Sequence, residues 1–351
     1  MTAVLALALA SVFALAACSS GSASSSASSA ASSASASSAA SSSAASSAAS
    51  SSAAAAGNAK IAIVQLADND AFTEMATAFK DEMAAQGYVE GKNVTYDMQS
   101  AQGDASTLNS IATNAAAGDY DLIVSIVTPA TQAVVNAQPK CPVVFISVTN
   151  PVGAGIMSSM DKPDKNATGT SNVIPVSEIF DLATKLTPSY KTVGLLYCSG
   201  EQNAVLTIEK TKEYLDSKNI PYVEQTVANS SEVQQAAQSL AGKADLIYIP
   251  VDSTVQSAMP QVVEAATAAG IPVYGSDPVM VKSGALASVS VSNTQLGARS
   301  AQMAAQILQG TDVASIPAEA LTDYQYVING ATADALSITL PTGDNYKVIG
   351  K

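Results

Sequence analysis

The chain has 351 residues, a formal net charge of −13 and no histidine. An acidic balance disfavours nucleic-acid binding, which needs a basic face, and the missing histidine removes the commonest metal ligand and the usual general base of hydrolase triads. All Asp, Glu, Lys and Arg residues follow position 58. The remainder, from about 59 to 351, therefore holds the whole charge and is long enough for two domains.

The first 58 residues predict a secretion signal and a tether. An apolar run ends in the pattern LAAC, which closes at Cys18, and almost only Ser and Ala follow it to about Ala56. The run is too short for a membrane span and has the small residues that a signal cleavage site needs. Because this order resembles the start of a bacterial lipoprotein, we predict a signal peptide at 1–17, acylation of Cys18 and a disordered tether at 18–58. No Lys or Arg precedes the run, and an ordinary signal removed together with Cys18 is the alternative.

Short apolar segments alternate with helical segments after the tether. Strands are predicted at 61–66, 93–98, 122–126 and 143–147, and helices at 71–86, at 106–117 and after Pro129. This alternation predicts parallel βαβ units with helices on both faces of a sheet.

The second half of the chain repeats the first. Residues 191–197 (KTVGLLY) echo 60–66 (KIAIVQL), residues 244–256 echo 120–132, and residues 271–278 echo 141–151. Two similar lobes in one chain explain these echoes. We therefore predict an α/β fold of two doubly wound parallel-sheet lobes.

Polar residues follow the predicted strands in both lobes, at the sheet edge where open α/β sheets bind ligands. In the first lobe they are Asp68, Asn69, Asp70, Ser125, Thr128, Ser147, Thr149 and Asn150, and in the second Ser199, Asn203, Asp252, Ser253, Ser276 and Asp277. Two such edges facing each other would form a cleft of hydroxyls, amides and carboxylates. Lobes joined at a hinge can close on a ligand held there.

Two hydroxyl residues stand at predicted helix starts. Thr128 precedes Pro129, which predicts a helix N-cap whose neighbouring free N–H groups could hold a carboxylate. Ser253 and Gln256 have capping-box spacing, so Ser253 could serve only to start its helix.

The acidic residues of the expected cleft leave two roles open. Asp252 and Asp277 could each pair with a ligand ammonium, or could be helix-terminal acids favoured by the macrodipole; Asp68 and Asp70 could be solvated loop acids. Arg299 is the only arginine, so no guanidinium fork for a phosphate or dicarboxylate is expected in the cleft. A zwitterion or a neutral polar ligand fits better than a strongly anionic one.

The aromatic residues and cysteines give weaker signals. Phe72, Tyr197, Tyr248 and Tyr274 lie on or near predicted strand ends or their loops, where they could cover a ring or belong to the core. Cys141 and Cys198 each lie at one end of a predicted strand. They could form a disulfide in an oxidising compartment, although two buried free thiols are the simpler interpretation.

Five segments together resemble one family, the substrate-binding lipoproteins of ABC transporters. They are 126–132 (IVTPATQ), 148–154 (VTNPVGA), 166–171 (NATGTS), 249–254 (IPVDST) and 284–288 (GALAS). Taken in order, they cover most of the region from 60 onward, and they are similar to the subfamily whose known members bind tryptophan, phenylalanine or tyrosine. Two departures face the expected cleft: residues 67–72 (ADNDAF) stand where members often carry His-Pro, and Asn150 stands where they often have Asp.

The resemblance implies a type I periplasmic-binding-protein fold with a three-crossing hinge, the crossings lying near 172–177, 286–292 and 323–327. We expect an N-terminal lobe of 59–174 plus 289–322 and a C-terminal lobe of 175–288 plus 323–351. The predicted ligand-binding residues are Asp70, Phe72, Ser125, Thr128, Thr149, Asn150, Asn172, Asn203, Asp252, Ser253 and Asp277.

The function implied by this resemblance is capture of an amino acid-like, and in the subfamily aromatic, solute for an ABC importer. We expect permease and ATPase partners, a lipid anchor on the extracytoplasmic face of the cell membrane, no cofactor, no metal, no nucleic acid and no enzymatic activity. Three alternatives remain open. They are a binder of a neutral solute such as a sugar or nucleoside, a two-lobed enzyme using Asp252 and Asp277 as acid and base, and a structural surface protein.

Overall fold

The computed structural model describes residues 58–343 and 345–350, which fall within one compact unit, Ser52–Lys351. The predicted signal peptide at 1–17, Cys18 and residues 18–57 of the predicted tether lie outside the described residues. Within the described residues, each helix falls short of the length or the hydropathy that a membrane span requires.

The first lobe is built on a six-stranded sheet in which every pairing is parallel. Its order is β11-β5-β4-β3-β1-β2. The strands are β1 (Ala59–Gln65), β2 (Val94–Ser100), β3 (Leu122–Ile126), β4 (Val143–Ile146), β5 (Ala167–Ser171) and β11 (Glu319–Ala320). The strands β3, β4 and β5 are buried along their whole length, as expected where helices cover both faces.

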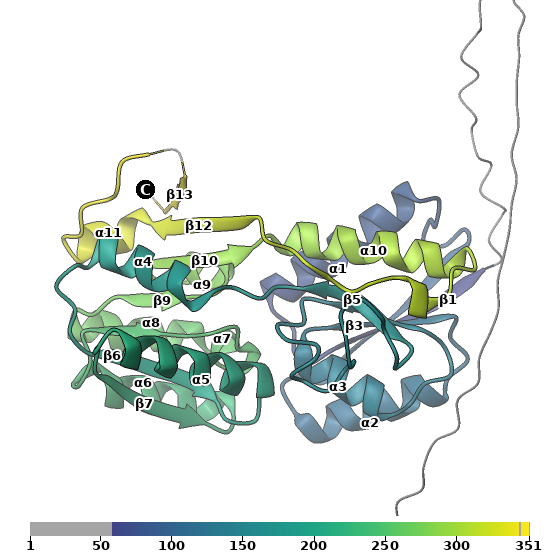
Figure 1. Ribbon diagram of the computed structural model, residues 1–351, viewed down its shortest axis with the longest axis horizontal. Coiled ribbons are helices and arrows are strands. Elements are labelled where there is room, and N and C mark those ends of the chain that lie inside the picture. Colours follow the sequence, from purple (N-terminus) through teal and green to yellow (C-terminus); the bar gives the residue numbers. More distant parts are fainter. Residues whose placement is uncertain (1–57, 344, 351) are drawn as a thin grey trace, which may run out of the picture. The chain divides into compact units, whose positions relative to one another are not determined.

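Four helices cover this sheet. Figure 1 shows α1 (Asp70–Ala85) and α10 (Asn293–Leu308) on one face and α2 (Ala105–Ala117) and α3 (Thr128–Asn136) on the other. The helices α1 and α10 lie very close, since a Cβ on Gly297 would stand 2.3 Å from the Met75 carbonyl oxygen. A helix from late in the chain thus completes a lobe that begins near its start.

The second lobe is built on a seven-stranded sheet in the order β13-β12-β10-β9-β8-β6-β7. The strands are β6 (Val193–Cys198), β7 (Tyr222–Val227), β8 (Leu246–Tyr248), β9 (Val273–Gly275), β10 (Ala287–Val291), β12 (Tyr324–Asn329) and β13 (Tyr346–Ile349). Only the pairing of β10 with β12 is antiparallel among these strands. The prediction of an α/β fold with two parallel-sheet lobes is confirmed.

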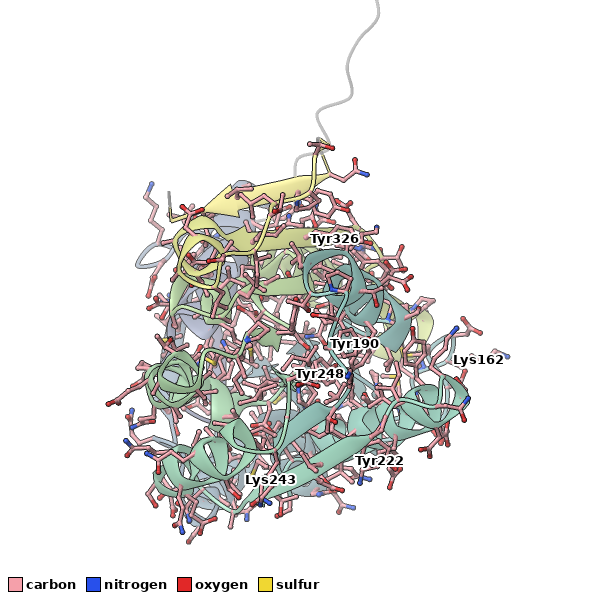
Figure 2. The ribbon with its side chains drawn as sticks, turned by 90° about the vertical axis from the view of Figure 1, so that its left-hand side faces the viewer. Lys162, Tyr190, Tyr222, Lys243, Tyr248 and Tyr326 are labelled. Carbon is pink, nitrogen blue, oxygen red and sulfur yellow. The ribbon has the colours of Figure 1, made fainter. Side chains whose placement is uncertain are left out.

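A hydrophobic core lies on each face of the second sheet, between the sheet and the helices that cover it. One lies under α4 (Val176–Leu186) and α5 (Gln202–Ser217); the other lies under α6 (Val233–Ala241), α7 (Ser253–Ser257), α8 (Met259–Ala269) and α9 (Pro278–Lys282). Tyr274 is buried in the first of these cores. Tyr248 is buried in the same core, whereas Lys243 is exposed (Figure 2). The short elements η1 (Ser230–Glu232) and α11 (Gly330–Ala335) complete the second lobe, and η2 (Val313–Ser315) packs against β5 in the first lobe.

The chain passes between the two sheets three times: after β5, after β10 and before β12. The predicted boundary after residue 288 falls three residues early. Strand β10 continues to Val291, which pairs with Tyr324 in the second sheet, because its alternating Ala-Ser-Val-Ser-Val sequence extends the strand. The crossing therefore lies at Ser292, the N-cap of α10.

Both cysteines of the described region are free thiols. Cys141 is half-buried and Cys198 is buried, and burial raises the pKa of each thiol.

Candidate functional site

Buried polar atoms without a hydrogen-bond partner gather at the carboxyl ends of the first lobe's strands. In sheet order they are Asn172 Oδ1 after β5, Ser147 Oγ and Thr149 Oγ1 after β4, Thr128 Oγ1 after β3, and Gln65 Oε1 and Asn69 Nδ2 at the end of β1. Buried polar groups are nearly always paired. A row of unpaired atoms along one sheet edge therefore marks a place where a polar ligand can supply the missing partners.

The second lobe adds two such atoms near the ends of β6 and β8. Asn203 donates its Nδ2 to the Val251 carbonyl oxygen at 2.7 Å, but its Oδ1 is unpaired. Gln256 in α7 has an unpaired Nε2. Both lobes thus present neutral amides or hydroxyls at the edges that were predicted to bind a ligand.

The backbone is strained at the centre of this row. Val127 has φ 66° and ψ 170°, and Ser147 has φ 64°. The Val127 N–H donates to the Ile146 carbonyl oxygen at 2.9 Å, which ties the two strand ends together. A β-branched residue at positive φ is an outlier that the surrounding fold must hold in place, and such strain clusters at ligand clamps.

This strained turn corrects the predicted role of Thr128. Val127, and not Thr128, occupies the N-cap of α3, and no side chain caps that helix. Thr128 is instead the first helical residue and is fully buried with its hydroxyl unpaired. The capping prediction was wrong because the turn begins one residue earlier than the Thr-Pro pattern indicates.

Asp252 has both carboxylate oxygens engaged by the backbone. It caps α7 by accepting the Val255 N–H at 2.8 Å, and it accepts the Cys198 N–H at 2.5 Å. Burial raises the pKa of Asp252 well above its ordinary value, and the neighbouring Glu201 charge raises it further. These contacts favour the helix-terminal role over pairing with an ammonium.

Glu201 was not singled out in the sequence and holds the same helix start. Its carboxylate accepts the N–H groups of Ser253 at 3.0 Å and Thr254 at 2.7 Å. The predicted capping box at Ser253 was therefore wrong: Asp252 is the cap, and Ser253 is the first helical residue. An acid directly before a helix, in a strand–loop–helix segment, is the only sequence signal for Glu201, and it does not show that the side chain is buried.

Asp277 also caps a helix. Its Oδ1 accepts the Val279 N–H at 2.7 Å, and its Oδ2 accepts from Asn293 Nδ2 at 3.2 Å. Burial raises the pKa of Asp277 to about 6. Like Asp252, it is committed to contacts within the protein.

The other predicted ligand-binding residues either have hydrogen-bond partners within the protein or lie away from the unpaired atoms. Ser125 Oγ lies 2.9 Å from Thr131 Oγ1, and Asn150 Oδ1 accepts the Gly153 N–H at 2.9 Å. Phe72 is buried in the first lobe's core, and Asp70 is exposed at the first residue of α1. The unpaired atoms at the strand ends therefore include those of Thr128, Thr149, Asn172 and Asn203 among the predicted ligand-binding residues, and also those of Asn69 and Ser147, which the sequence placed at the same edge, and of Gln65 and Gln256. Three further unpaired buried hydroxyls lie within strands, on Tyr96 in β2 and on Ser288 and Ser290 in β10.

Side chains of the two lobes meet beside this set. Gln132 Nε2 donates to Gln202 Oε1 at 2.8 Å, and Gln202 Nε2 donates to the Gly153 carbonyl oxygen at 3.2 Å. A cavity of about 160 Å³ is lined from the first lobe by Leu66, Ala67, Asp68, Gln102 and Gly103, and from the second by Ser230, Ser253, Thr254 and Ser257. The candidate site is the region between the Gln132–Gln202 contact and this cavity, at the carboxyl ends of the strands.

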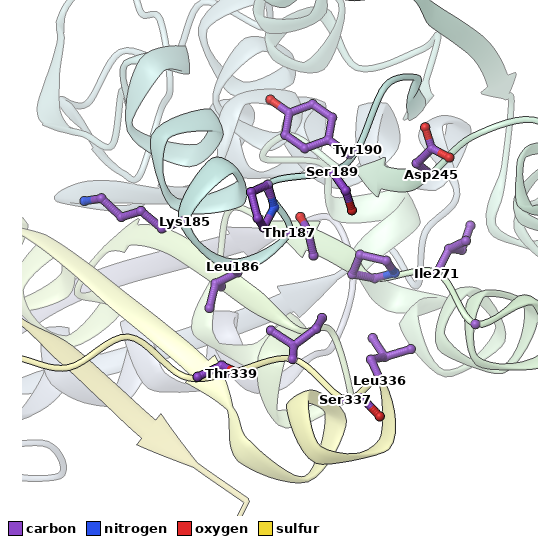
Figure 3. Close-up of a pocket in the computed structure, with 14 residues that line it drawn as sticks. Lys185, Leu186, Thr187, Ser189, Tyr190, Asp245, Ile271, Leu336, Ser337 and Thr339 are labelled. Atoms are coloured by element: carbon purple, nitrogen blue, oxygen red, sulfur yellow. The ribbon is translucent and has the colours of Figure 1, made fainter.

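A larger cavity of about 580 Å³ lies elsewhere, where β8 and β9 begin (Figure 3). Its polar groups have partners: Thr187 Oγ1 lies 2.9 Å from Tyr274 Oη, and Asp245 Oδ2 accepts the N–H groups of Lys191 and Thr192. Because it is at the opposite strand ends and none of its lining residues has a buried polar side-chain atom without a partner, we do not assign the ligand to it. No cluster of His, Cys, Asp or Glu side chains suited to a metal ion occurs in residues 58–343 and 345–350.

Comparisons with known proteins match this picture. Residues 60–343 match the family described as ABC transporter substrate binding protein. The tyrosine-binding protein of Clostridioides difficile (strain R20291) is 35% identical over 289 residues, which are 82% of this chain and 84% of that protein.

Two solved structures are similar over most of the described region. The ABC domain in complex with L-Trp from Streptococcus pneumonia is 32% identical, covers 81% of this chain and 96% of its own, and has a TM-score of 0.78. The ligand-free, open structure of a substrate binding protein with adhesive properties from Clostridium difficile is 34% identical, covers 83% and 99%, and has a TM-score of 0.64.

Proposed function

The chain belongs to the family of ABC transporter substrate-binding proteins, and from this premise we propose that it captures an aromatic L-amino acid between its two lobes. The family binds solutes and is not an enzyme family, and its members work outside the cytoplasm with permease and ATPase subunits. Closure of lobes around a ligand is then the mechanism, and no bond is made or broken.

One observation carries the proposal: the row of unpaired, buried, uncharged polar atoms at the carboxyl ends of the strands. The hydroxyls of Thr128, Ser147 and Thr149 cluster after β3 and β4, beside the positive end of α3, and suit a carboxylate. The amide oxygens of Asn172 and Asn203 suit an ammonium. These unpaired atoms carry no charge, and the Asp68 carboxylate that lines the adjoining cavity accepts from Gln65 and Gln102. An uncharged row of this kind matches a zwitterion whose two charges cancel.

The carboxylates that were expected to bind the ligand ammonium already accept hydrogen bonds from groups of this chain. Asp252 and Asp277 each accept hydrogen bonds on both oxygens from groups of this chain. We therefore assign ammonium recognition to amide oxygens instead of acids, and carboxylate recognition to hydroxyls with the α3 start.

The relatives support the aromatic class. One is a tyrosine-binding protein and another was solved with L-Trp, at 35% and 32% identity. The TM-score is higher with the L-Trp complex (0.78) than with the ligand-free, open structure (0.64), which supports treating the contacts between the lobes as those of the closed form. Because Asn150 and residues 67–72 depart from the family pattern, L-tyrosine and L-tryptophan are both first candidates.

We propose in addition that Cys18 is acylated and that residues 18–58 tether the binding protein to the membrane. The support is the LAAC pattern and the uncharged Ser/Ala tract. Mass spectrometry of the N-terminal peptide from membrane fractions would detect a lipid-modified Cys18. Release of a Cys18→Ser variant into the medium is the expected companion result; an unmodified mature N-terminus downstream of Cys18 would refute the anchor.

Ligand binding is tested by thermal unfolding and calorimetry of the secreted protein against the amino acids, nucleosides and common sugars. A ligand at a hundredfold excess over Kd stabilises the folded state by about 2.7 kcal/mol. We expect L-tyrosine or L-tryptophan to stabilise, and their D-enantiomers, amides and deaminated analogues to fail. Stabilisation by a sugar or nucleoside, with no amino acid active, would refute the proposal.

A further inference from the structure

We propose that Glu74 stabilises the closed form of the protein. Its carboxylate joins the two lobes on one side of the candidate site, a contact that we call the latch, and this contact sets how long the ligand is retained. This inference rests on the proposed function, because retention has meaning only for a bound ligand. The argument begins from three side chains that meet on one side of the site.

Glu74 lies on α1 in the first lobe. Its Oε1 pairs with Lys282 Nζ at 2.5 Å, and Lys282 is the last residue of α9 in the second lobe. Its Oε2 accepts from Asn293 Nδ2 at 3.2 Å, and Asn293 is the first residue of α10, directly after the crossing at Ser292. One carboxylate therefore holds both a residue of the other lobe and a residue at the hinge.

Asn293 extends the contact to a fourth residue. Its Nδ2 also donates to Asp277 Oδ2 at 3.2 Å, and Asp277 caps α9. Asn293 and Asp277 are buried, and Val279 of α9 packs into the hydrophobic core of the first lobe. Opening the lobes at this side must break the Glu74–Lys282 ion pair and the Asn293–Asp277 hydrogen bond, and it must uncover Val279.

No other ion pair of the described residues joins the lobes. Lys80–Glu90 and Arg299–Glu319 lie within the first lobe, and Lys212–Glu224 lies within the second. The Glu74–Lys282 pair is partly exposed, with side chains 36% and 51% accessible, so its contribution to global stability is small. Its position, across the lobes, is what gives it a role in opening.

The other side of the site is closed by uncharged groups. There Gln132 and Gln202 pair across the lobes, from α3 and α5. The helix α5 and the helix α9 cover opposite faces of the second sheet. Ligand release therefore requires breaking a charged contact on one side and an amide contact on the other, and only the charged contact is weakened by salt.

The test is the dissociation rate of L-tryptophan from the full mature chain, followed by ligand fluorescence, which is selective because the protein has no tryptophan. Tritiated L-tyrosine in rapid dilution replaces it if the wild type binds only tyrosine. The variants are E74Q and K282Q, with E90Q as the matched control, since Glu90 pairs with Lys80 inside one lobe. The charge exchange E74K/K282E tests rescue.

We expect E74Q and K282Q to raise koff about 2- to 5-fold, the size of effect that a partly exposed ion pair has, and to change kon little, as interface mutations generally act on koff. Salt should raise koff of the wild type and of E90Q, and should have little effect on E74Q. The charge exchange should restore a slow koff. Unchanged koff in E74Q, or an equal change in E90Q, would overturn the latch.

A second measurement needs no ligand and separates failure of the latch from failure of the proposed function. Spin labels at Lys92→Cys and Lys243→Cys, in a Cys141→Ser background, report the distance between the lobes by pulsed electron paramagnetic resonance; both lysines are exposed. E74Q should shift the distribution to longer distances and E90Q should not. Identical distributions refute the latch even if no aromatic amino acid binds, whereas a shift without ligand binding refutes only the proposed ligand.

Discussion

Glu201 and Asp252 place two buried carboxylates on the same helix start. Asp252 accepts the Val255 N–H, and Glu201 accepts the N–H groups of Ser253 and Thr254. Together the two carboxylates accept the first three N–H groups of α7, which have no partner within the helix itself. Gln202, next to Glu201 in the chain, contacts the first lobe, so this arrangement also fixes a residue of the lobe interface.

The Glu201→Gln variant should be less stable by about 1–3 kcal/mol, because one acceptor oxygen is replaced by an NH₂ group and a buried backbone N–H is left unpaired. Urea unfolding followed by circular dichroism measures the loss. The matched control is Glu213→Gln on the exposed side of α5, which should change stability by less than about 0.5 kcal/mol. Equal stabilities for E201Q and the wild type would show that the helix start does not depend on Glu201.

Thr128→Val should have opposite effects on stability and on binding. The Thr128 hydroxyl is buried and has no hydrogen-bond partner within the protein, so its removal should raise the free energy of unfolding measured without ligand by about 1 kcal/mol. The same change should weaken binding of L-tyrosine or L-tryptophan roughly 10-fold or more, since a ligand hydrogen bond is lost. Calorimetry and urea unfolding measure the two effects.

Thr131→Val is the contrasting control for that experiment. Thr131 is equally buried, but its hydroxyl donates to the Val127 carbonyl oxygen at 2.8 Å and lies 2.9 Å from Ser125 Oγ. Its replacement should destabilise the ligand-free protein. Binding by T128V at wild-type strength would remove Thr128 from the site.

At position 127, the glycine variant should be at least as stable as the alanine variant, which reverses the usual order. Its φ of 66° with ψ of 170° lies in a region that glycine alone occupies readily. Val127→Ala loses buried methyl groups and keeps the strain from its Cβ, whereas Val127→Gly relieves the strain. We therefore expect V127G to be at least as stable as V127A in urea unfolding.

Val134 supplies the control for this ordering. It is buried in the interior of α3, where glycine is less favourable than alanine by about 1 kcal/mol. V134G should therefore be less stable than V134A. The same order at Val127 would mean that its backbone relaxes without strain.

The alternation of apolar and helical segments predicted most of the first sheet. The strand 122–126 agrees with β3 at both ends, and 143–147 exceeds β4 by one residue, because buried parallel strands read as short apolar runs. The edge strand β2 was displaced by one or two residues, since its exposed side leaves less pattern to read.

The site was harder to predict for physical reasons. The Thr-Pro pattern indicates a helix start, but no local rule predicts that valine would take a positive φ just before it. Whether a hydroxyl is left unpaired, as at Thr128 and not at Ser125, depends on neighbours brought together by folding. The Glu74–Lys282 contact joins residues 208 positions apart, which no pattern within either segment signals.

Asp277 should give the stability of the protein a distinct dependence on pH. Burial raises the pKa of Asp277 from 3.8 to about 6, the nearby Glu74 charge acts in the same direction, and hydrogen bonds from Val279 and Asn293 and the Lys282 charge oppose it. Between these values the folded state binds more protons than the unfolded state, so this group's contribution to stability falls as pH rises from about 4 to about 6. The shift corresponds to about 3 kcal/mol.

Asp277→Asn removes this titration, so the stability difference between the wild type and D277N should fall as pH rises through that window and stay constant above it. Urea unfolding at a series of pH values measures the difference. Asp164 is the control of opposite sign: hydrogen bonds from Ser158 lower the pKa of Asp164, so its contribution is present at neutral pH and is lost as pH falls. A difference for D277N that is flat with pH, or that has the sign of D164N, would show that the Asp277 carboxyl is not held in a dry environment.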